Sequence, residues 1–167
     1  MRTAVLLAGI VAACLAQPAG SQEWTTFVEP QFGTRLDLPS EVFTVHEGPS
    51  IKGIGEEYIT SDGRAALAVY SQRNLRREKP ATYLKRNYKT PRRAMDYVRV
   101  TRSFFAVSAV NEGTIYYSRC NFSRSSGGTI HCFDLKYPAS EKRAWDDIVT
   151  RISRSLGPLE RSRASSG

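Results

Sequence analysis

The sequence predicts an α+β fold, an antiparallel β-sheet of about six strands packed against a C-terminal amphipathic helix and one short helix. Three observations predict it: alternating strand patterns joined by turn residues, an apolar helical stripe near the C-terminus, and two cysteines in strands that flank one turn. A helix-covered antiparallel sheet buries these apolar faces together. The chain of 167 residues, 41% hydrophobic and 24% charged, suffices for one domain with a sizeable core.

The first segment has the composition of a secretory signal peptide. One Arg precedes ten apolar or small residues, 4–13, and further small residues follow. Such a run is too short to span a membrane and is typical of a leader that is cleaved on export. We therefore expect a periplasmic or secreted protein. The expected organisation is 1–16 signal peptide, 17–30 N-terminal extension, 31–157 single α+β domain and 158–167 disordered tail.

The cleavage site has two interpretations. Small residues around Cys14 and Ala16 suit ordinary signal peptidase, which would release a soluble product. The run VAAC that ends at Cys14 also resembles a bacterial lipobox, in which Cys14 would be lipidated and the protein would stay anchored in the envelope. Only thirteen residues precede Cys14, which is short for a lipoprotein leader. The soluble product is therefore the favoured interpretation.

The first half of the domain is predicted to form strands. Apolar and polar side chains alternate over residues 32–38, and Pro39 ends that alternation. Asp62-Gly63 favours a tight hairpin turn, because both positions tolerate positive φ. The expected strands are residues 32–38 with an extension over 41–45, then 55–60 and 65–71.

A short helix and four more strands follow. Pro80 suits the first turn of a helix over residues 79–89, and Pro91 ends it. Asn-Glu-Gly at 111–113 joins two of the strands, with Gly113 at a left-handed position. The expected strands are residues 95–101, 104–110, 114–122 and 129–137.

The last element is a helix over residues 141–156. Ser140 can cap it, Gly157 ends it and Pro158 prevents its continuation. Its apolar side chains fall on one stripe, which we expect to pack on the sheet. They are Trp145, Ile148, Val149, Ile152 and Leu156.

Cys120 and Cys132 are predicted to form a disulfide bond. They are the pair left after export to an oxidising compartment. The strands that hold them flank the turn sequence SRSSGG, and if Phe122 faces Ile130, the two cysteines lie directly opposite each other. Opposed residues at a non-hydrogen-bonded site have Cα atoms about 4.5 to 5.5 Å apart, within reach of a disulfide.

Metal binding and thiol catalysis are weaker alternatives for these cysteines. A zinc site needs four ligands, and only His46 and His131 could complete it. A redox pair usually has Cys-x-x-Cys spacing, which is absent. His131 could serve as a base, but adjacent strand residues point to opposite faces, so it should point away from Cys132.

Several segments resemble the PsbP/DcrB-like α/β sandwich family. They are the strand RLDLPSEVF, the mid-chain helix and the ending KYPASEKRAWDDIVTRISRSL, with its Tyr-Pro turn, long helix and closing Ser-Leu. The chain also resembles small exported proteins of Gram-negative soil bacteria. The resemblance covers about residues 32–156 and brings no shared catalytic residues. It implies a fold and a binding or accessory role.

Positive charge is concentrated between Arg73 and Arg102. This segment holds eleven basic and two acidic residues, a net charge of +9, while the whole chain carries +8. Such a cluster favours an anionic partner, which for an exported protein means lipid headgroups, lipopolysaccharide, acidic polysaccharide or an acidic protein. The leader argues against nucleic acid, and a solvated face without a ligand is the alternative. The candidate contact residues are Arg76, Arg77, Lys85, Arg86, Lys89, Arg92 and Arg93.

Recognisable catalytic, metal and cofactor motifs are absent from the sequence, so we assign no catalytic residue, metal or cofactor. Asp146-Asp147 is expected on a solvated helix face, His46 in a surface loop, and His131 on a strand surface facing Asn121. The favoured function is a non-enzymatic, exported binding or accessory module of the bacterial envelope. Two alternatives stay open. One is a small secreted enzyme with a site assembled from distant residues, such as His131 and a carboxylate, and the other is a structural envelope protein with an exposed sheet edge.

Overall fold

The structure, a computed structural model, describes residues 22–123 and 128–159. The predicted signal peptide, the two interpretations of Cys14 and residues 160–167 of the predicted tail lie outside the described residues. Within the described part, no helix is long and apolar enough to cross a membrane.

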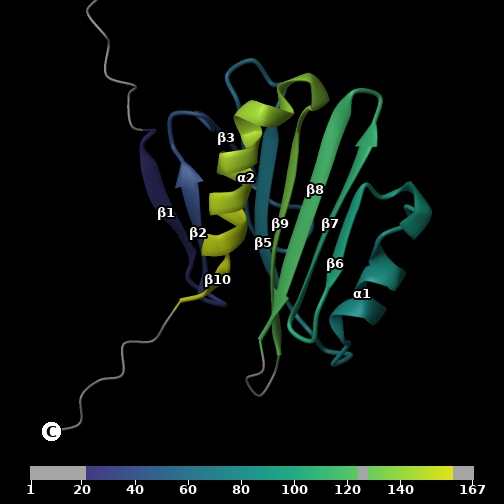
Figure 1. Cartoon of the computed structure of the whole chain (residues 1–167). Coiled ribbons are helices and arrows are strands. Elements are labelled where there is room, and N and C mark those ends of the chain that lie inside the picture. The colour runs from purple at the N-terminus through teal and green to yellow at the C-terminus, as the bar shows by residue number, and fades with distance from the viewer. Residues whose placement is uncertain (1–21, 124–127, 160–167) are drawn as a thin grey trace, which may run out of the picture.

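Ten strands and two α-helices make up the described chain (Figure 1). The strands are β1 (Trp24–Glu29), β2 (Thr34–Pro39), β3 (Val45–Pro49), β4 (Ile54–Ile59), β5 (Ala66–Arg73), β6 (Tyr97–Val100), β7 (Phe104–Asn111), β8 (Thr114–Phe122), β9 (Thr129–Pro138) and β10 (Gly157–Pro158). The helices are α1 (Pro80–Asn87) and α2 (Lys142–Ser155), with short 3₁₀ turns η1 (Arg92–Ala94) and η2 (Ala139–Glu141).

The strands form two antiparallel sheets. The large sheet has seven strands in the order β3-β4-β5-β9-β8-β7-β6, and the small sheet has the order β1-β2-β10. The α+β class, the two helices and the antiparallel sheet of about six strands are therefore confirmed, with seven strands in the large sheet, while the separate small sheet was not predicted. Apart from the step from β5 to β9, neighbours in the large sheet follow one another in sequence, so tight turns can set their register.

The predicted turns have the backbone that their residues favour. Gly63, between β4 and β5, has a φ of +69°, and Gly113, between β7 and β8, has a φ of +74°. Only glycine adopts this left-handed region readily. These two turns fix the register on either side, with Ile59 opposite Ala66 and Asn111 opposite Thr114.

Three corrections concern the ends of the domain. Strand β1 lies within the segment predicted as an N-terminal extension, 17–30, and pairs with β2 along its whole length. Pro158, assigned to the disordered tail, pairs with Thr34 in the small sheet. The 3₁₀ turn η2 takes up the residues around Ser140, so α2 begins at Lys142. Strand β1 pairs with the next strand along the chain, whereas Pro158 pairs with a residue that is far away in sequence, which local patterns do not reveal.

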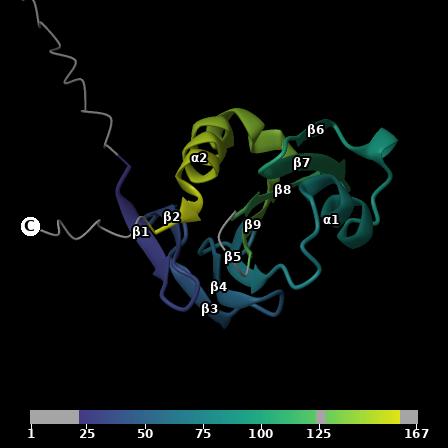
Figure 2. The ribbon, with the colours of Figure 1, turned by 90° about the horizontal axis from the view of Figure 1, so that it is seen from below.

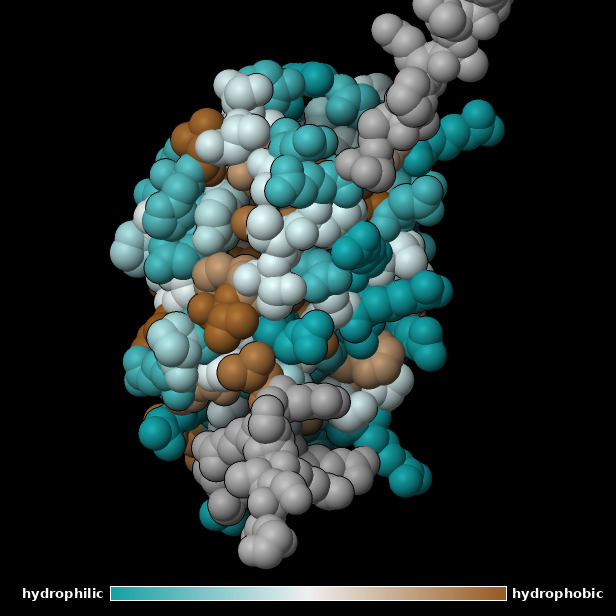
Figure 3. Space-filling model, turned by 90° about the vertical axis from the view of Figure 1, so that its left-hand side faces the viewer, coloured by the Kyte–Doolittle hydropathy of each residue, from teal (hydrophilic) through white to brown (hydrophobic). Residues whose placement is uncertain are grey.

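The large sheet separates two layers (Figure 2). Helix α2 and the small sheet cover one face, here called the α2 face, and α1 lies against the opposite face, here called the α1 face. Figure 3 shows the side of the molecule that carries β1. Brown side chains appear there in small groups among teal and white ones, wherever grey atoms do not cover the surface.

The larger core fills the α2 face. The stripe predicted for the last helix is confirmed in the main, because Trp145, Val149 and Ile152 are buried against the sheets. The indole of Trp145 stacks on Tyr137 of β9 at a centroid distance of 5.1 Å. Phe43 also packs against this indole, at a centroid distance of 5.9 Å. This helix therefore joins the small sheet to the large one.

A buried polar contact links the two sheets and corrects the prediction for His131. His131 does pair with Asn121, but its side chain is 1% exposed rather than on a strand surface. The cause is the small sheet, which covers this end of β9. Thr34 of β2 hydrogen-bonds to the Nδ1 of His131 (2.6 Å) and to the hydroxyl of Ser71 on β5. Ser71 also donates to the carboxylate of Glu29 (3.5 Å), which is buried as well.

Candidate functional site: the basic surface and the pockets around α1

Helix α1 is short, and Pro80 and Tyr88 mark its two ends. Pro80 stands at the first helical position, where its missing N–H leaves no hydrogen bond unmade. At the other end, the N–H of Tyr88 bonds to the carbonyl of Leu84 while its backbone is already extended. Tyr83 is the side chain that anchors the helix, because it is buried against Phe105 and Phe122. The outward face of α1 is left to basic side chains.

All seven predicted contact residues are exposed, and together they are called the basic surface from here on. Lys85 and Arg86 occupy the last turn of α1, and Lys89 follows it. Arg92 and Arg93 lie in the 3₁₀ turn η1. Arg76 and Arg77 precede α1, in a turn that Asn74 closes by hydrogen bonds to the backbone of Glu78 (2.9 Å each).

Three members of the basic surface line one pocket of about 480 Å³. They are Lys85, Lys89 and Arg92. The same pocket is lined by apolar side chains, among them Leu84, Met95 and Val100. It therefore combines an apolar lining with cationic side chains. Arg76, Arg77 and Arg93 lie outside it.

Arg86 lies outside this pocket and pairs with an acidic neighbour. Its guanidinium forms two hydrogen bonds with the carboxylate of Glu78, at 2.8 and 2.6 Å. It also lies over the ring of Tyr83, 5.6 Å from the centroid. The hydrogen bonds from Arg86 lower the pKa of the Glu78 carboxyl. Glu78 therefore neutralises Arg86, and among the described residues neither Lys85 nor Lys89 has an acidic partner.

The predicted disulfide is present and lies behind α1. Cys120 and Cys132 are directly opposite each other on β8 and β9, with Cα atoms 4.1 Å apart, and both are fully buried. Phe122 faces Ile130, as the prediction required. The bond belongs to the smaller core, which also contains Tyr83. It therefore fixes the strands on which α1 packs.

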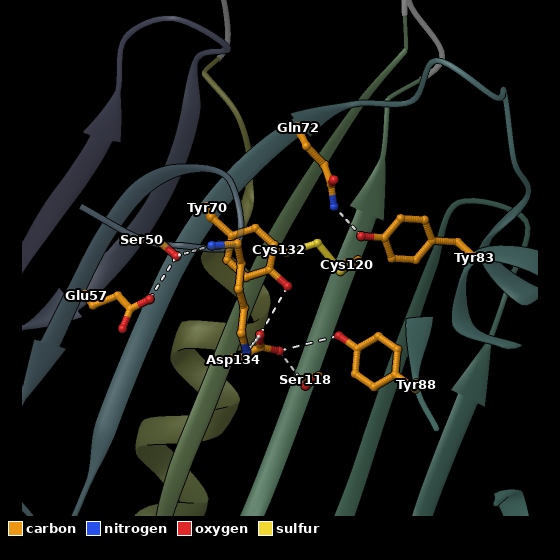
Figure 4. Close-up of polar contacts among 11 residues, drawn as sticks. Ser50, Glu57, Tyr70, Gln72, Tyr83, Tyr88, Ser118, Cys120, Cys132 and Asp134 are labelled. Carbon is orange, nitrogen blue, oxygen red and sulfur yellow. Dashed lines mark hydrogen bonds and ion pairs between the residues drawn. A yellow bond between two sulfur atoms is a disulfide. The ribbon is translucent and has the colours of Figure 1, made fainter. Parts of the chain in front are cut away.

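A second pocket, of about 440 Å³, lies beside the first and was not predicted. The two share Tyr88, Lys89 and Thr90 in their linings. At its centre is Asp134 of β9, and Figure 4 shows the side chains that converge on it. The carboxylate accepts hydrogen bonds from Tyr70 (3.1 Å), Tyr88 (3.4 Å) and Ser118 (2.5 Å), and it pairs with Lys52 at 2.6 Å.

The tyrosine hydroxyls in this pocket are kept protonated. Burial, and then the negative charge of Asp134, raise the pKa of Tyr70 and of Tyr88 well above the ordinary tyrosine value. Burial likewise raises the pKa of Tyr83, whose hydroxyl accepts a hydrogen bond from Gln72. All three hydroxyls therefore stay protonated at physiological pH. The pocket can hold hydrogen-bonding ligands, but its tyrosines are not poised to accept protons.

Sequence patterns could not bring these residues together. They come from β5, β8, β9, the loop before β4 and the end of α1. The sequence does hold one signal, because Asp134 is an acidic residue between Phe133 and Leu135 in a strand that is mostly apolar and aromatic, Thr129 to Tyr137. A carboxylate in such a strand requires buried or half-buried partners. Its partners depend on the strand order.

Neither histidine of the sequence lines the two pockets around α1. Among residues 22–123 and 128–159, no group of three or more His, Cys, Asp and Glu side chains could hold a metal ion. His131 and Glu29 approach each other through Ser71 and Thr34, but all four side chains are buried. His46 is exposed on β3 and pairs with Glu56 at 2.8 Å. It is therefore on a strand, not in the predicted loop.

No protein-family model and no curated protein matches the sequence. Solved structures do match the fold. Cyanobacterial PsbP (CyanoP) from Synechocystis sp. PCC 6803 has a TM-score of 0.59 and 11% identity, covering 90% of this chain and 99% of that one. The Ran-binding protein Mog1p of Saccharomyces cerevisiae has a TM-score of 0.51 and 11% identity, covering 83% and 97%. LpqN, involved in cell envelope biogenesis of Mycobacterium tuberculosis, has a TM-score of 0.47 and 12% identity, covering 81% and 91%.

The chain therefore has the PsbP/Mog1-like α/β fold, as its resemblance to PsbP/DcrB-like proteins predicted. At 11% identity the similarity establishes the fold alone. Proteins of one fold carry out many functions, so the function has to be argued from this chain's own surface.

Proposed function

We propose that this protein is an exported, non-enzymatic binding module of the bacterial envelope, whose basic surface contacts phosphate-bearing lipids. The observation that carries the proposal is the pocket of Lys85, Lys89 and Arg92 beside Leu84, Met95 and Val100. Phosphate groups of acidic lipid headgroups or lipopolysaccharide would meet the cations, and the start of an acyl chain would meet the apolar side chains. Export is supported by the leader-like residues 1–16 and by the Cys120–Cys132 disulfide, because disulfides persist in oxidising compartments.

Electrostatics and burial both favour this assignment. Cationic side chains near an anionic membrane contribute about 1 kcal/mol each. In the described chain neither Lys85 nor Lys89 has an acidic partner, so both are available to an outside anion. Arg86 is committed to Glu78 and serves less well. An acidic protein, which the sequence left open as a partner, would use the same cations but would not require the apolar part of the pocket.

A matched pair of variants tests the proposal. We expect the mature protein to bind phosphatidylglycerol vesicles or lipopolysaccharide and to leave phosphatidylcholine vesicles free. Lys85→Glu/Lys89→Glu should weaken binding at least about thirtyfold, since two contacts of about 1 kcal/mol each are lost. The control Lys136→Glu/Arg143→Glu makes the same change of net charge at exposed sites outside the pocket. It should weaken binding far less.

Salt gives the second readout of the same experiment. The screening length falls from about 10 Å at 0.1 M to about 3 Å at 1 M, so binding through exposed charges must weaken with added salt. Sedimentation with vesicles and calorimetry measure both effects. A wild-type protein that binds neither anionic surface would overturn the lipid proposal. Binding that is equally strong at high salt would do the same, as would equal losses in the two double variants.

A further inference from the structure

A groove of about 510 Å³ lies on the α2 face of the large sheet, beside α2 and over β6, β7 and β8. Helix α2 packs mainly on β2 and β9 and reaches β8 through Ser153, which hydrogen-bonds to Tyr117 and Arg119. The volume falls within the range of about 300 to 1,000 Å³ that is usual for ligand sites. This groove is on the opposite side of the sheet from the basic surface, and the proposed function does not use it.

The pairing of three strands explains why the sheet is hollow here. Ser108 of β7 lies between Tyr97 of β6 and Tyr117 of β8, and Ala106 lies between Arg99 and Arg119 in the next row. Paired residues in neighbouring strands project from the same face. Two small side chains therefore form the floor, and large aromatic and basic side chains rise on either side of it. The wall from α2 includes Thr150, Ser153 and Arg154.

Arg119 carries a charge that the described chain does not balance. Its guanidinium is half-buried and lies 4.3 Å from the centroid of the Phe104 ring. Its Nε donates to the Oδ1 of Asn121 and its Nη1 to the Oγ of Ser153, both at 3.0 Å, and both acceptors are neutral. Burial lowers the pKa of this group below the ordinary arginine value. A cation in such a position is stabilised by an anion close to it.

Two more arginines line the same groove. Arg99 lies on the other side of Ala106 from Arg119, and its guanidinium is 5.4 Å from the centroid of the Phe104 ring. Arg154 belongs to α2. Asp146 is the acidic side chain of the described lining, and Lys142 already pairs with it at 2.9 Å. Three arginines are thus left without an acidic partner among the described residues. Their guanidinium groups present planar sets of donors, which match carboxylate and phosphate oxygens.

We propose that this groove is a binding site for a small anionic ligand with a ring-shaped, hydroxylated body, such as an acidic sugar. Arg99, Arg119 and Arg154 hold its carboxylate or phosphate. Tyr97 and Tyr117 contact the ring. The hydroxyls of Ser108 and Thr150 line the same space and bond to the hydroxyl groups of the ligand. A polyanion spread over a flat surface would not use the enclosed floor at Ala106.

The test uses the mature, oxidised protein and three probes: glucuronate, glucose 6-phosphate and neutral glucose. We expect at least one anionic probe to bind with shifts of the backbone amide signals of β6, β7 and β8, and glucose not to bind. Comparing glucuronate with glucose 6-phosphate distinguishes a carboxylate site from a phosphate site. Arg99→Gln/Arg154→Gln, which changes two exposed side chains, should weaken binding at least about tenfold, because each removes hydrogen bonds to a charged group.

Three controls make the result decisive. Arg143→Gln removes an exposed arginine of α2 that is not part of the groove lining, and binding should stay as in the wild type. Lys85→Glu/Lys89→Glu should also leave it unchanged, so that failure of the lipid proposal and failure of this one are separate results. Arg119→Lys keeps the charge but not the planar fork, and binding should weaken. If neither anionic probe binds, or if glucose binds as well as they do, the groove is not an anion site.

Discussion

The two faces of the large sheet are held together by different means. On the α2 face, Trp145, Phe43 and Tyr137 pack within a large apolar core shared by two sheets and a helix. On the α1 face, a helix of 8 residues covers a smaller core that contains a disulfide. A small core buries less apolar surface and gains less from it, so a covalent link makes up a larger share of the stability there. The face that carries the lipid-contact proposal is thus the one held by a covalent bond.

The largest effect is expected from the α2 face. Trp145→Ala removes a buried indole and leaves a cavity between α2 and Tyr137, at a cost of about 3 to 5 kcal/mol in the free energy of unfolding. Trp24→Ala is the matched control, because the indole of Trp24 is only half-buried on β1. Denaturation in urea measures both. Equal losses for the two tryptophans would show that α2 does not organise the core.

The disulfide is expected to matter next. Replacing Cys120 and Cys132 by Ala should lower the free energy of unfolding by about 3 kcal/mol, since the bond closes a short loop in the unfolded chain. The loss should be concentrated on the α1 face. Hydrogen exchange should therefore accelerate in β8, β9 and α1 more than in β2 and α2. Uniform acceleration in both layers would contradict the difference between the two faces.

The same contrast explains what the sequence could predict. Turns at Gly63 and Gly113, the stripe on α2 and the opposed cysteines are features of short segments, and their positions followed from local patterns. The burial of His131 and the partners of Asp134 depend on which distant strands lie together. The sequence also identified the basic residues but not their grouping. Glu78, eight residues before Arg86, takes that arginine out of the expected cluster.

The arginines of the groove could not be grouped from the sequence either. Arg99 and Arg119 are twenty residues apart and meet only because β7 pairs with both β6 and β8. Net charge by segment pointed to 73–102, which contains Arg99 but neither Arg119 nor Arg154. A count along the chain favours charges that are close in sequence. It does not find charges that a sheet collects on one face.

The smallest expected effect concerns the buried contact between the sheets, and it depends on pH. Burial lowers the pKa of His131 below its ordinary value of 6.5, and the charge of Glu29 only partly opposes this. As the pH falls through 6.5, the unfolded chain takes up a proton that the folded protein does not, so the free energy of unfolding decreases. The loss is about 1.4 kcal/mol for each unit between the two pKa values, and it ends once the pH is below the folded value.

Urea denaturation between pH 7.5 and 5 checks this expectation, because most carboxyl groups stay ionised in that window. His131→Asn can keep a hydrogen bond to Thr34 and should remove this part of the pH dependence, whatever it costs in stability at pH 7.5. If His131→Asn and the wild type have the same slope, His131 gains its proton equally in both states, and the small sheet does not seal this end of the large one.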